Sequence, residues 1–522
     1  MGIGLGMIAF LGIVPQTTGA EEEDFLKDAQ VLPLRETLAR ALEKNLDIQI
    51  EEQEIPISRE SVVIEDSVFD PEAFGQTYSN ERRNPSSSSL NSGGFSISRE
   101  TGGDVGVRKA FPFGLESSLS LHSARSMNNS RVDGLRPQYR NQLLLNLTQP
   151  ILRDMGYDVN LTQVRLSKNQ VEQAVYTYLD RAQRICETIE TTYYQLAEAI
   201  SIYNDRLESE SLAQKLLEGN QEKFKAGLAP ISEVQETETA LASRRELVIS
   251  ARQQVELAEN RLKDYLEIRS GDPLYSVPLL TEEIPLAFES YPAFDETLDL
   301  AYTNRPDLKH LRMEIENWNI RLQYYENQKW PRLDLQSTLG FNGLSGNART
   351  ASDIGGAPIS ISPHAGDYFD SFSHLVDGEG VEWYVGFTVS YPIGNRASAA
   401  RYRMSDEQKS QALYQLKRLE GLVETEIKNG LVNVQRSWER VEVARRFEEL
   451  AALTLQQEMQ KFEFGTTDSF RVLDFQEDVI EARIRKEMAV ADYRQGLVNL
   501  FRAMGTNLQR HDIQVKWDET ME

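Results

Sequence analysis

Apolar residues recur along the chain at intervals of three, four and seven positions. One such series consists of Leu416, Val423, Ile427, Leu431, Val434, Trp438 and Val441. The positions between them are mostly Glu, Gln, Arg and Lys, a pattern typical of helices that pack through a coiled-coil seam. We therefore predict long helices over residues 160–225 and 397–464, each followed by a returning helix, over 231–269 and 469–504. About 65 helical residues span on the order of 100 Å, so the helix pairs should form long hairpins.

Other segments, near residues 69–149 and 332–391, alternate strictly between apolar and polar residues. One face of a predicted strand carries Trp383, Val385, Phe387, Val389 and Tyr391. Alternation over about ten residues is typical of an outer-membrane strand, with one face toward lipid and the other toward a lumen. A strand of a soluble sandwich has the same pattern, so alternation alone leaves both interpretations open.

Two further features favour a membrane barrel. Each strand-rich segment contains only two to four strands, which is too few to close a barrel, so several chains would have to contribute. Long polar loops are also predicted at residues 84–94 and 343–380, and long loops are typical of the extracellular side of such barrels. The strand number stays open, because segments 105–107 and 115–121 would add a hairpin around residues 111–114.

The order of these elements is repeated. The match of Glu36-Thr37-Leu38 to Glu296-Thr297-Leu298 is followed, in the same order, by Pro150-Ile151 to Pro392-Ile393 and by Phe224 and Gly227 to Phe462 and Gly465. Ordered matches of this kind indicate a tandem duplication. Each copy should have a first helix (34–54 and 294–328), strands, a long helix and a returning helix. We place the copies at residues 21–270 and 293–508, joined by a proline-rich linker at 271–292 and followed by a tail at 509–522.

Residues 1–20 have the features of a secretory signal peptide, with an apolar stretch over 3–14 and small residues at Thr18-Gly19-Ala20, although no basic residue precedes the stretch. Outside that segment, no apolar run approaches the roughly 18 residues that a transmembrane helix needs. The 522 residues carry a net charge of −25, which argues against nucleic acid as a partner. The single cysteine, Cys186, cannot form an internal disulfide.

The sequence contains no catalytic motif such as a P-loop, HExxH or a Gly-x-Ser-x-Gly turn. The five histidines are scattered, and only His364 and His374 share one glycine-rich loop. We therefore expect no enzymatic activity, no cofactor and no metal site.

Several segments together resemble the TolC-like outer-membrane efflux protein family. They are LRETLARALEKNLDI, TQPILR, ETLDLAYTNRPDLKHLRMEIE, WPRLDL, VGFTVSYPIGNR and GTTDSFRVLDFQEDVIEARIRKEMAVADYRQGLVNL. The resemblance covers residues 34–504 and implies a mainly α protein with a β-barrel part. In it, duplicated long α-helical coiled-coil hairpins would join strands that contribute to a trimeric transmembrane β-barrel.

The same resemblance implies a function and partners. The chain would be the outer-membrane channel of a tripartite efflux or type I secretion system, a passive duct for small molecules or polypeptides. It would form a homotrimer in outer-membrane lipid, and its periplasmic helices would meet a periplasmic adaptor protein and an inner-membrane pump. The alternative is a soluble or surface coiled-coil scaffold whose strands form a small sandwich. The cargo stays open.

The hairpin tips, at residues 227–233 and 465–474, are the candidate functional positions. The adaptor-facing candidates are Gly227, Leu228, Pro230, Gly465, Thr466 and Asp468. Glycine allows the chain to leave the long helix with positive φ, and Pro230 and Asp468 suit the start of the next helix.

The resemblance also implies that acidic residues after the second tip narrow the channel entrance. Asp474 fits that pattern and Arg471 departs from it, while Glu233 and Glu236 take the equivalent places in the first copy. An acidic ring would favour cations. Alternatively, Arg471 would pair with Asp474 or Glu236 and latch the entrance closed.

Overall fold

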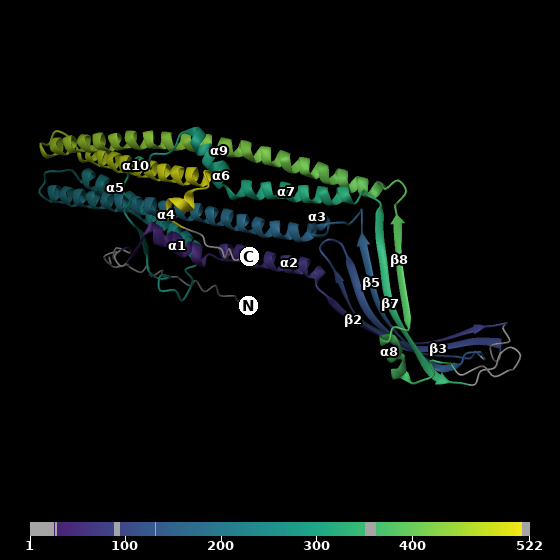
Figure 1. Ribbon diagram of the computed structural model, residues 1–522. Coiled ribbons are helices and arrows are strands. Elements are labelled where there is room, and N and C mark those ends of the chain that lie inside the picture. Colours follow the sequence, from purple (N-terminus) through teal and green to yellow (C-terminus); the bar gives the residue numbers. More distant parts are fainter. Residues whose placement is uncertain (1–25, 27–28, 88–93, 131, 350–361, 514–522) are drawn as a thin grey trace, which may run out of the picture. The chain divides into compact units, whose positions relative to one another are not determined.

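The computed structural model describes residues 26, 29–87, 94–130, 132–349 and 362–513, so the predicted signal peptide lies outside the described residues. The chain forms two compact units (Figure 1). Unit 1 comprises Met1–Glu52, Thr177–Leu308 and Leu419–Glu522, and unit 2 comprises Gln53–Tyr176 and Lys309–Arg418. Within the described ranges, four helices have residues in both units: α2 (Leu46–Asp66), α4 (Thr162–Lys225), α7 (Pro306–Asn327) and α9 (Arg396–Glu463).

Unit 1 is built from helices and one small parallel pair of strands. Its elements are β1 (Gln30–Leu32), α1 (Leu34–Lys44), the start of α2 (Leu46–Asp66), most of α4 (Thr162–Lys225), α5 (Ile231–Tyr265), β6 (Leu279–Thr281), α6 (Phe294–Asn304), most of α9 (Arg396–Glu463), α10 (Ser469–Ala503) and α11 (Asn507–Arg510). Strand β1 pairs with β6, with Gln30 opposite Leu279. The four long helices form two hairpins, α4–α5 and α9–α10, as predicted (Figure 1).

The predicted seam of α9 is buried at four of its seven positions, and the other three, Leu416, Leu431 and Trp438, are half-buried. Val423, Ile427 and Val434 are fully buried, and Val441 is nearly so. Helix α10 packs directly on this seam, since a Cβ on Gly430 would lie 3.1 Å from Leu500 Cδ1. Buried aliphatic residues at three- and four-residue intervals hold antiparallel helices together by knobs-into-holes packing.

The first helix of each copy was predicted as one helix, and the structure corrects this to two. The break between α1 and α2 falls at Asn45, whose Oδ1 accepts from the backbone N–H of Asp47 at 3.0 Å and so caps the second helix. The break between α6 and α7 (Pro306–Asn327) falls at Arg305. Proline disfavours helical geometry at the residue before it, which ends α6 at this point.

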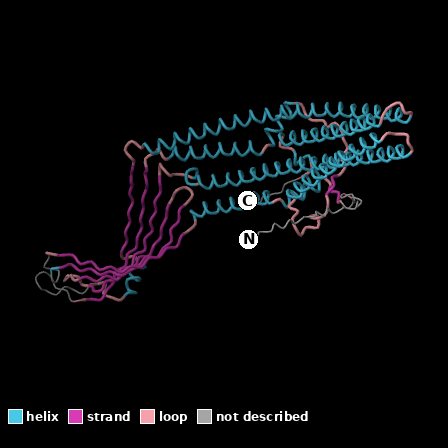
Figure 2. Tube along the Cα trace, turned by 180° about the vertical axis from the view of Figure 1, so that it is seen from behind, coloured by secondary structure: helices cyan, strands magenta, loops and turns pink. Residues whose placement is uncertain are grey.

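Unit 2 contains a six-stranded sheet in the order β2-β3-β4-β5-β7-β8, with every neighbouring pair antiparallel. Figure 2 shows its strands side by side in magenta. The strands are β2 (Glu72–Pro85), β3 (Phe95–Ala110), β4 (Glu116–Asn128), β5 (Leu135–Pro150), β7 (Arg332–Ala348) and β8 (Gly380–Ser390). The short elements of this unit are η1 (Ser67–Phe69), α3 (Tyr157–Asn160) and α8 (Tyr368–Val376). The extra hairpin is present as β3–β4, and it turns at Gly114 with φ of +98°.

The two faces of the sheet differ in chemistry. One row across β3 to β8 consists of Val107, Leu119, Leu145, Leu339 and Trp383. The next row lies on the opposite face and consists of Arg108, Ser118, Asn146, Thr338 and Tyr384. Directly opposed residues of antiparallel strands share a face, so the sheet is apolar on one side and polar on the other.

Part of the predicted loop at 343–380 is structured, because β7 extends to Ala348 and α8 follows. Helix α8 begins with a capping box, in which Asp367 accepts from the N–H of Phe369 and Asp370 while Asp370 accepts from the N–H of Asp367. Leu375 is buried, and the Tyr368 hydroxyl lies 2.7 Å from Ser123 Oγ of β4. None of the helices among the described residues carries an apolar stretch that is long enough to cross a bilayer.

Candidate functional site at the hairpin tips

The two tips have the same backbone geometry. Gly227 and Gly465 follow the long helices with φ of +74° and +68°. The N–H of Leu228 donates to the carbonyl oxygen of Lys223 at 2.8 Å, and the N–H of Thr466 donates to that of Lys461 at 3.0 Å. These bonds, together with those of the two glycines, are the Schellman motif that ends a helix with a left-handed residue. Glycine is favoured there because an L side chain would crowd the following carbonyl.

The returning helices begin differently. Asp468 caps α10, since its Oδ1 accepts from the N–H of Arg471 at 2.9 Å. Pro230 occupies the same place before α5, with an extended backbone and no side chain that can accept a bond. The second tip is therefore the more firmly capped of the two, by roughly 1 kcal/mol for a side-chain cap.

Large apolar side chains are exposed around the tips. Leu228 is 80% exposed, Phe464 84% and Phe470 61%. The ammonium of Lys223 lies 4.1 Å from the ring centre of Phe462, which joins the first tip to the second. Highly exposed large apolar side chains at both tips are consistent with a surface that binds another protein.

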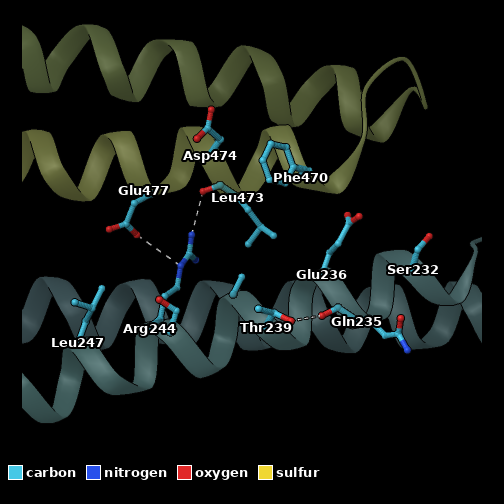
Figure 3. Close-up of a pocket in the computed structure, with 12 residues that line it drawn as sticks. Ser232, Gln235, Glu236, Thr239, Arg244, Leu247, Phe470, Leu473, Asp474 and Glu477 are labelled. Carbon is cyan, nitrogen blue, oxygen red and sulfur yellow. Dashed lines mark hydrogen bonds and ion pairs between the residues drawn. The ribbon is translucent and has the colours of Figure 1, made fainter.

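The four predicted gate residues separate into two groups. Glu236 and Asp474 line one crevice of 680 Å³ between α5 and α10, and Glu233 and Arg471 do not (Figure 3). Asp474 also acts on its neighbour: burial raises the pKa of Asp478, and the charge of Asp474 raises it further. The exposed side of α10 next to the crevice is therefore strongly acidic.

Arg471 lies beside Glu458 of α9 in this structure, and its predicted pairing with Asp474 or Glu236 stays a prediction. The Nε of Arg471 lies 3.9 Å from Glu458 Oε1 of α9, within the same hairpin. Glu458 is buried, and its carboxylate accepts from Lys461 at 2.9 Å and from Thr467 at 2.7 Å. The bonds from Lys461 and Thr467 lower the pKa of Glu458. Arg471 thus lies at the edge of this cluster, within the second tip.

One link between the two hairpins involves a residue that was not among the candidates predicted from the sequence. Arg244 of α5 is 5% exposed and reaches across to α10 (Figure 3). Its Nη2 donates to the Leu473 carbonyl oxygen at 3.0 Å, and its Nη1 donates to Gln476 Oε1 at 3.2 Å. Its Nε lies 3.7 Å from Glu477 Oε2. Burial lowers the pKa of Arg244, and the charge of Glu477 opposes that shift.

Glu477 is shared by two arginines. Besides Arg244 of α5, Arg206 of α4 approaches it, with Nη1 2.7 Å from Glu477 Oε1. Both helices of the first hairpin are therefore bound to one carboxylate of the second. The side chain of Arg244 is buried, whereas those of Arg206 and Glu477 are 17% and 32% exposed, so removing one member should cost less than the about 3–5 kcal/mol of a fully buried pair. This cluster is a specific connection between the hairpins.

A second cluster of charged side chains, also in unit 1, joins α10 to α4 and α9. Arg483 of α10 pairs with Glu208 of α4 at 2.5 Å, and it lies 3.7 Å from both Asp205 of α4 and Glu448 of α9. Burial raises the pKa of Asp205 to about 6 in spite of Arg483.

Among the described residues, one group of side chains is arranged so that it could hold a metal ion, and it lies in unit 2 rather than at the tips.

Comparison with known proteins identifies the family. A family model for "Outer membrane efflux protein" matches residues 110–266 and 297–506, which together exceed half of the chain. Among curated proteins, none matches the sequence.

The fold is similar to three solved structures. The Campylobacter jejuni CmeC outer membrane channel has 17% identity, a TM-score of 0.63, and a match covering 91% of this chain and 86% of that chain. The outer membrane protein VceC from Vibrio cholerae has 13% identity, a TM-score of 0.62, and coverage of 90% and 96%. The open state of the Neisseria gonorrhoeae MtrE outer membrane channel has 14% identity, a TM-score of 0.54, and coverage of 90% and 88%. At these identities the likeness concerns the fold, and the family model decides membership: the chain belongs to the outer membrane efflux protein family.

Proposed function

We propose that this chain is the outer-membrane channel of a tripartite efflux or type I secretion system and acts as a passive exit duct. The observation that carries the proposal is the sheet of unit 2, which has one apolar face, one polar face and two free edges. The duct performs no reaction, and its selectivity comes from the charge and width of its openings.

The apolar face has a length close to that of a membrane band. On β8 it runs from Val381 to Val389, and eight residue steps of about 3.3 Å span about 26 Å along the strand. With a strand tilt of about 40°, this length covers about 20 Å along the membrane normal, somewhat less than the roughly 25 Å apolar band of outer-membrane barrels. Trp383 is 76% exposed and Phe387 is 65% exposed on this face. Covering exposed aromatic side chains of this kind with lipid removes their apolar surface from water, which is favourable.

The free edges require partner strands. Strands β2 and β8 each have one neighbour in the sheet. In lipid, unpaired backbone groups cost several kcal/mol each, so an open edge is not viable there. The sheet has an even number of alternating antiparallel strands, so β8 runs opposite to β2. Copies of the chain can therefore join β8 to β2 in the same antiparallel pattern.

A homotrimer closed in this way would have 18 strands, six from each chain. With strands about 4.8 Å apart and tilted by about 40°, its backbone radius would be roughly 18 Å. Barrels of 16 to 18 strands leave a water-filled channel. The extra hairpin β3–β4 accounts for two of the six strands that each chain contributes.

The helical hairpins would lie in the periplasm, with their tips toward the partners. Leu228, Phe464 and Phe470 supply an apolar surface for a periplasmic adaptor protein, which would in turn connect to an inner-membrane pump. The Arg244–Glu477 cluster would hold the hairpins in one arrangement, and a partner that binds another arrangement more tightly would shift the population toward it. Glu236 and Asp474 would give the entrance its negative charge.

Cell fractionation and gel mobility test this function. The duct predicts outer-membrane material that migrates as a trimer when unheated and as a single chain when heated. The alternative, a coiled-coil scaffold, predicts a protein that stays dissolved without detergent. Recovery of the chain in the soluble fraction would rule out the duct.

A further inference from the structure

Three potential metal ligands meet beside helix α8 in unit 2. They are His364, just before α8, His374, in its last turn, and Glu379, just before β8. One ligand atom of each residue lies within 4.8 Å of those of the other two. The proposed transport role uses none of these residues.

The local backbone explains why they meet. Helix α8 ends in the same Schellman geometry as the hairpins, with Gly378 at φ of +69°. The N–H of Glu379 donates to the carbonyl oxygen of His374 at 3.3 Å. The chain therefore folds back and brings Glu379 to the side of the helix that carries His374.

His374 is oriented for metal binding. Its Nδ1 lies 2.7 Å from the carbonyl oxygen of Leu344 on β7. A carbonyl oxygen only accepts, so Nδ1 carries the proton and Nε2 has the free lone pair. This is the arrangement in which metal-binding histidines are commonly held, with the second ring nitrogen bonded to a carbonyl.

The other two ligands can adjust around His374. The ring centres of His364 and His374 are 5.3 Å apart. The Nδ1 of His364 lies 3.7 Å from Glu379 Oε2, which is too far for a hydrogen bond. The side chains of His364 and Glu379 are 40% and 50% exposed, so rotation about their side-chain bonds can close the site around an ion.

We propose that His364, His374 and Glu379 bind one Zn²⁺ ion. Two imidazoles and one carboxylate are a recurrent zinc ligand set, and the fourth tetrahedral position would take water. Calcium and magnesium prefer oxygen ligands, so this donor set disfavours them. The bound ion would tie the segment before α8 to the end of that helix and to the start of β8.

Metal titration of the purified full-length chain in detergent tests this site, using Zn²⁺ and, as a spectroscopic probe, Co²⁺. We expect one Zn²⁺ per chain, with a Kd below about 1 µM, and a visible Co²⁺ absorption of tetrahedral intensity. His374→Ala and Glu379→Gln should each raise the Kd at least tenfold and abolish the Co²⁺ signal.

His310→Ala is the matched control, because it removes a histidine outside the cluster, and it should bind like the parent protein. Absence of stoichiometric binding in the parent chain would overturn the proposal, as would equal binding by His374→Ala and His310→Ala. Gel mobility of each variant as an unheated trimer reports folding separately. Channel conductance is measured independently, so failure of this site leaves the transport proposal untouched.

Discussion

Arg244 in the first hairpin donates a hydrogen bond to the carbonyl oxygen of Leu473 in the second, 3.0 Å away. The bond joins a side chain to the backbone, so it survives most substitutions at position 473 and depends almost entirely on the arginine. Glu477 completes the connection through Arg244 and Arg206.

We predict that Glu477→Ala opens the channel. The substitution leaves Arg244 and Arg206, both in the first hairpin, without the carboxylate through which they bind the second, so the two hairpins should separate more readily. Single-channel conductance in planar bilayers should rise several-fold. Arg245→Ala is the control, because Arg245 pairs with Glu210 inside the first hairpin at 2.9 Å and is exposed. Equal conductance of both variants and the parent would exclude the cluster as a lock.

The acidic crevice should set ion preference. Asp474→Asn combined with Glu236→Gln removes two negative charges at the crevice between α5 and α10 and should reduce the preference for cations. The reversal potential in a salt gradient measures this preference. Glu233→Gln, which lies outside the crevice, should change it much less. A larger shift from Glu233→Gln would place the selective charges elsewhere.

Asp205 should make the helical unit less stable at high pH. Because burial raises its pKa to about 6, the folded state takes up a proton before the unfolded state as the pH falls. This contribution to stability therefore increases as the pH falls from 7 toward 4. Asp205→Asn should stabilise the protein by about 1–2 kcal/mol at pH 8 and be nearly neutral at pH 4.

Thermal melting followed by circular dichroism measures this difference at the two pH values. Glu208→Gln provides the comparison, since Glu208 binds the same Arg483 but is half exposed. Its effect should stay within about 0.5 kcal/mol, as for most exposed ion pairs. Stabilisation by Asp205→Asn that is equal at pH 8 and pH 4 would contradict the assignment.

The two faces of β8 should respond oppositely to charge. Phe387→Arg places a cation on the apolar face, which costs about 2–4 kcal/mol at the middle of a membrane. Thr388→Arg places the same cation on the polar face of the same strand. The amount of unheated trimer in the outer membrane should fall for Phe387→Arg and persist for Thr388→Arg. The reverse order would mean that the apolar face is turned inward.

Replacing Gly465, the glycine at the tip of the second hairpin, should destabilise the tip. Gly465→Ala keeps ample space, because no atom lies within 4 Å of the added Cβ, but it forces alanine into positive φ at about 1–2 kcal/mol. Gly421→Ala, in an exposed part of α9 with equal space, should stabilise its helix by up to about 1 kcal/mol. Hydrogen exchange at the tip amides should accelerate in the first variant alone.

The sequence predicted the long helices and their tips well, because a heptad seam and a glycine at its end are local signals that tertiary packing only reinforces. It missed the breaks at Asn45 and Arg305, although Asn before a new helix and Arg305 before proline were both readable. It missed α8, a short helix whose capping Asp367 lies within a glycine-rich segment. The spacing of apolar residues alone does not reveal such a cap.

Arg244 was harder to find. It occupies a seam position between Leu241 and Val248, and all three residues are buried. A charged residue in a seam signals a specific polar contact, but its partners on α10 depend on how the hairpins meet. The partner of Arg471 is open for the same reason, since its position in the sequence fits Asp474 and Glu236 as well as Glu458. The assignment of Glu233, Glu236, Arg471 and Asp474 to a gate stays a prediction.

The subunit count of detergent-solubilised protein tests the shared barrel most directly. Native mass spectrometry should give a mass of three chains, with no monomer that is stable in the absence of detergent. A monodisperse, water-soluble single chain would contradict the account, because the free edges of β2 and β8 would then need no partner.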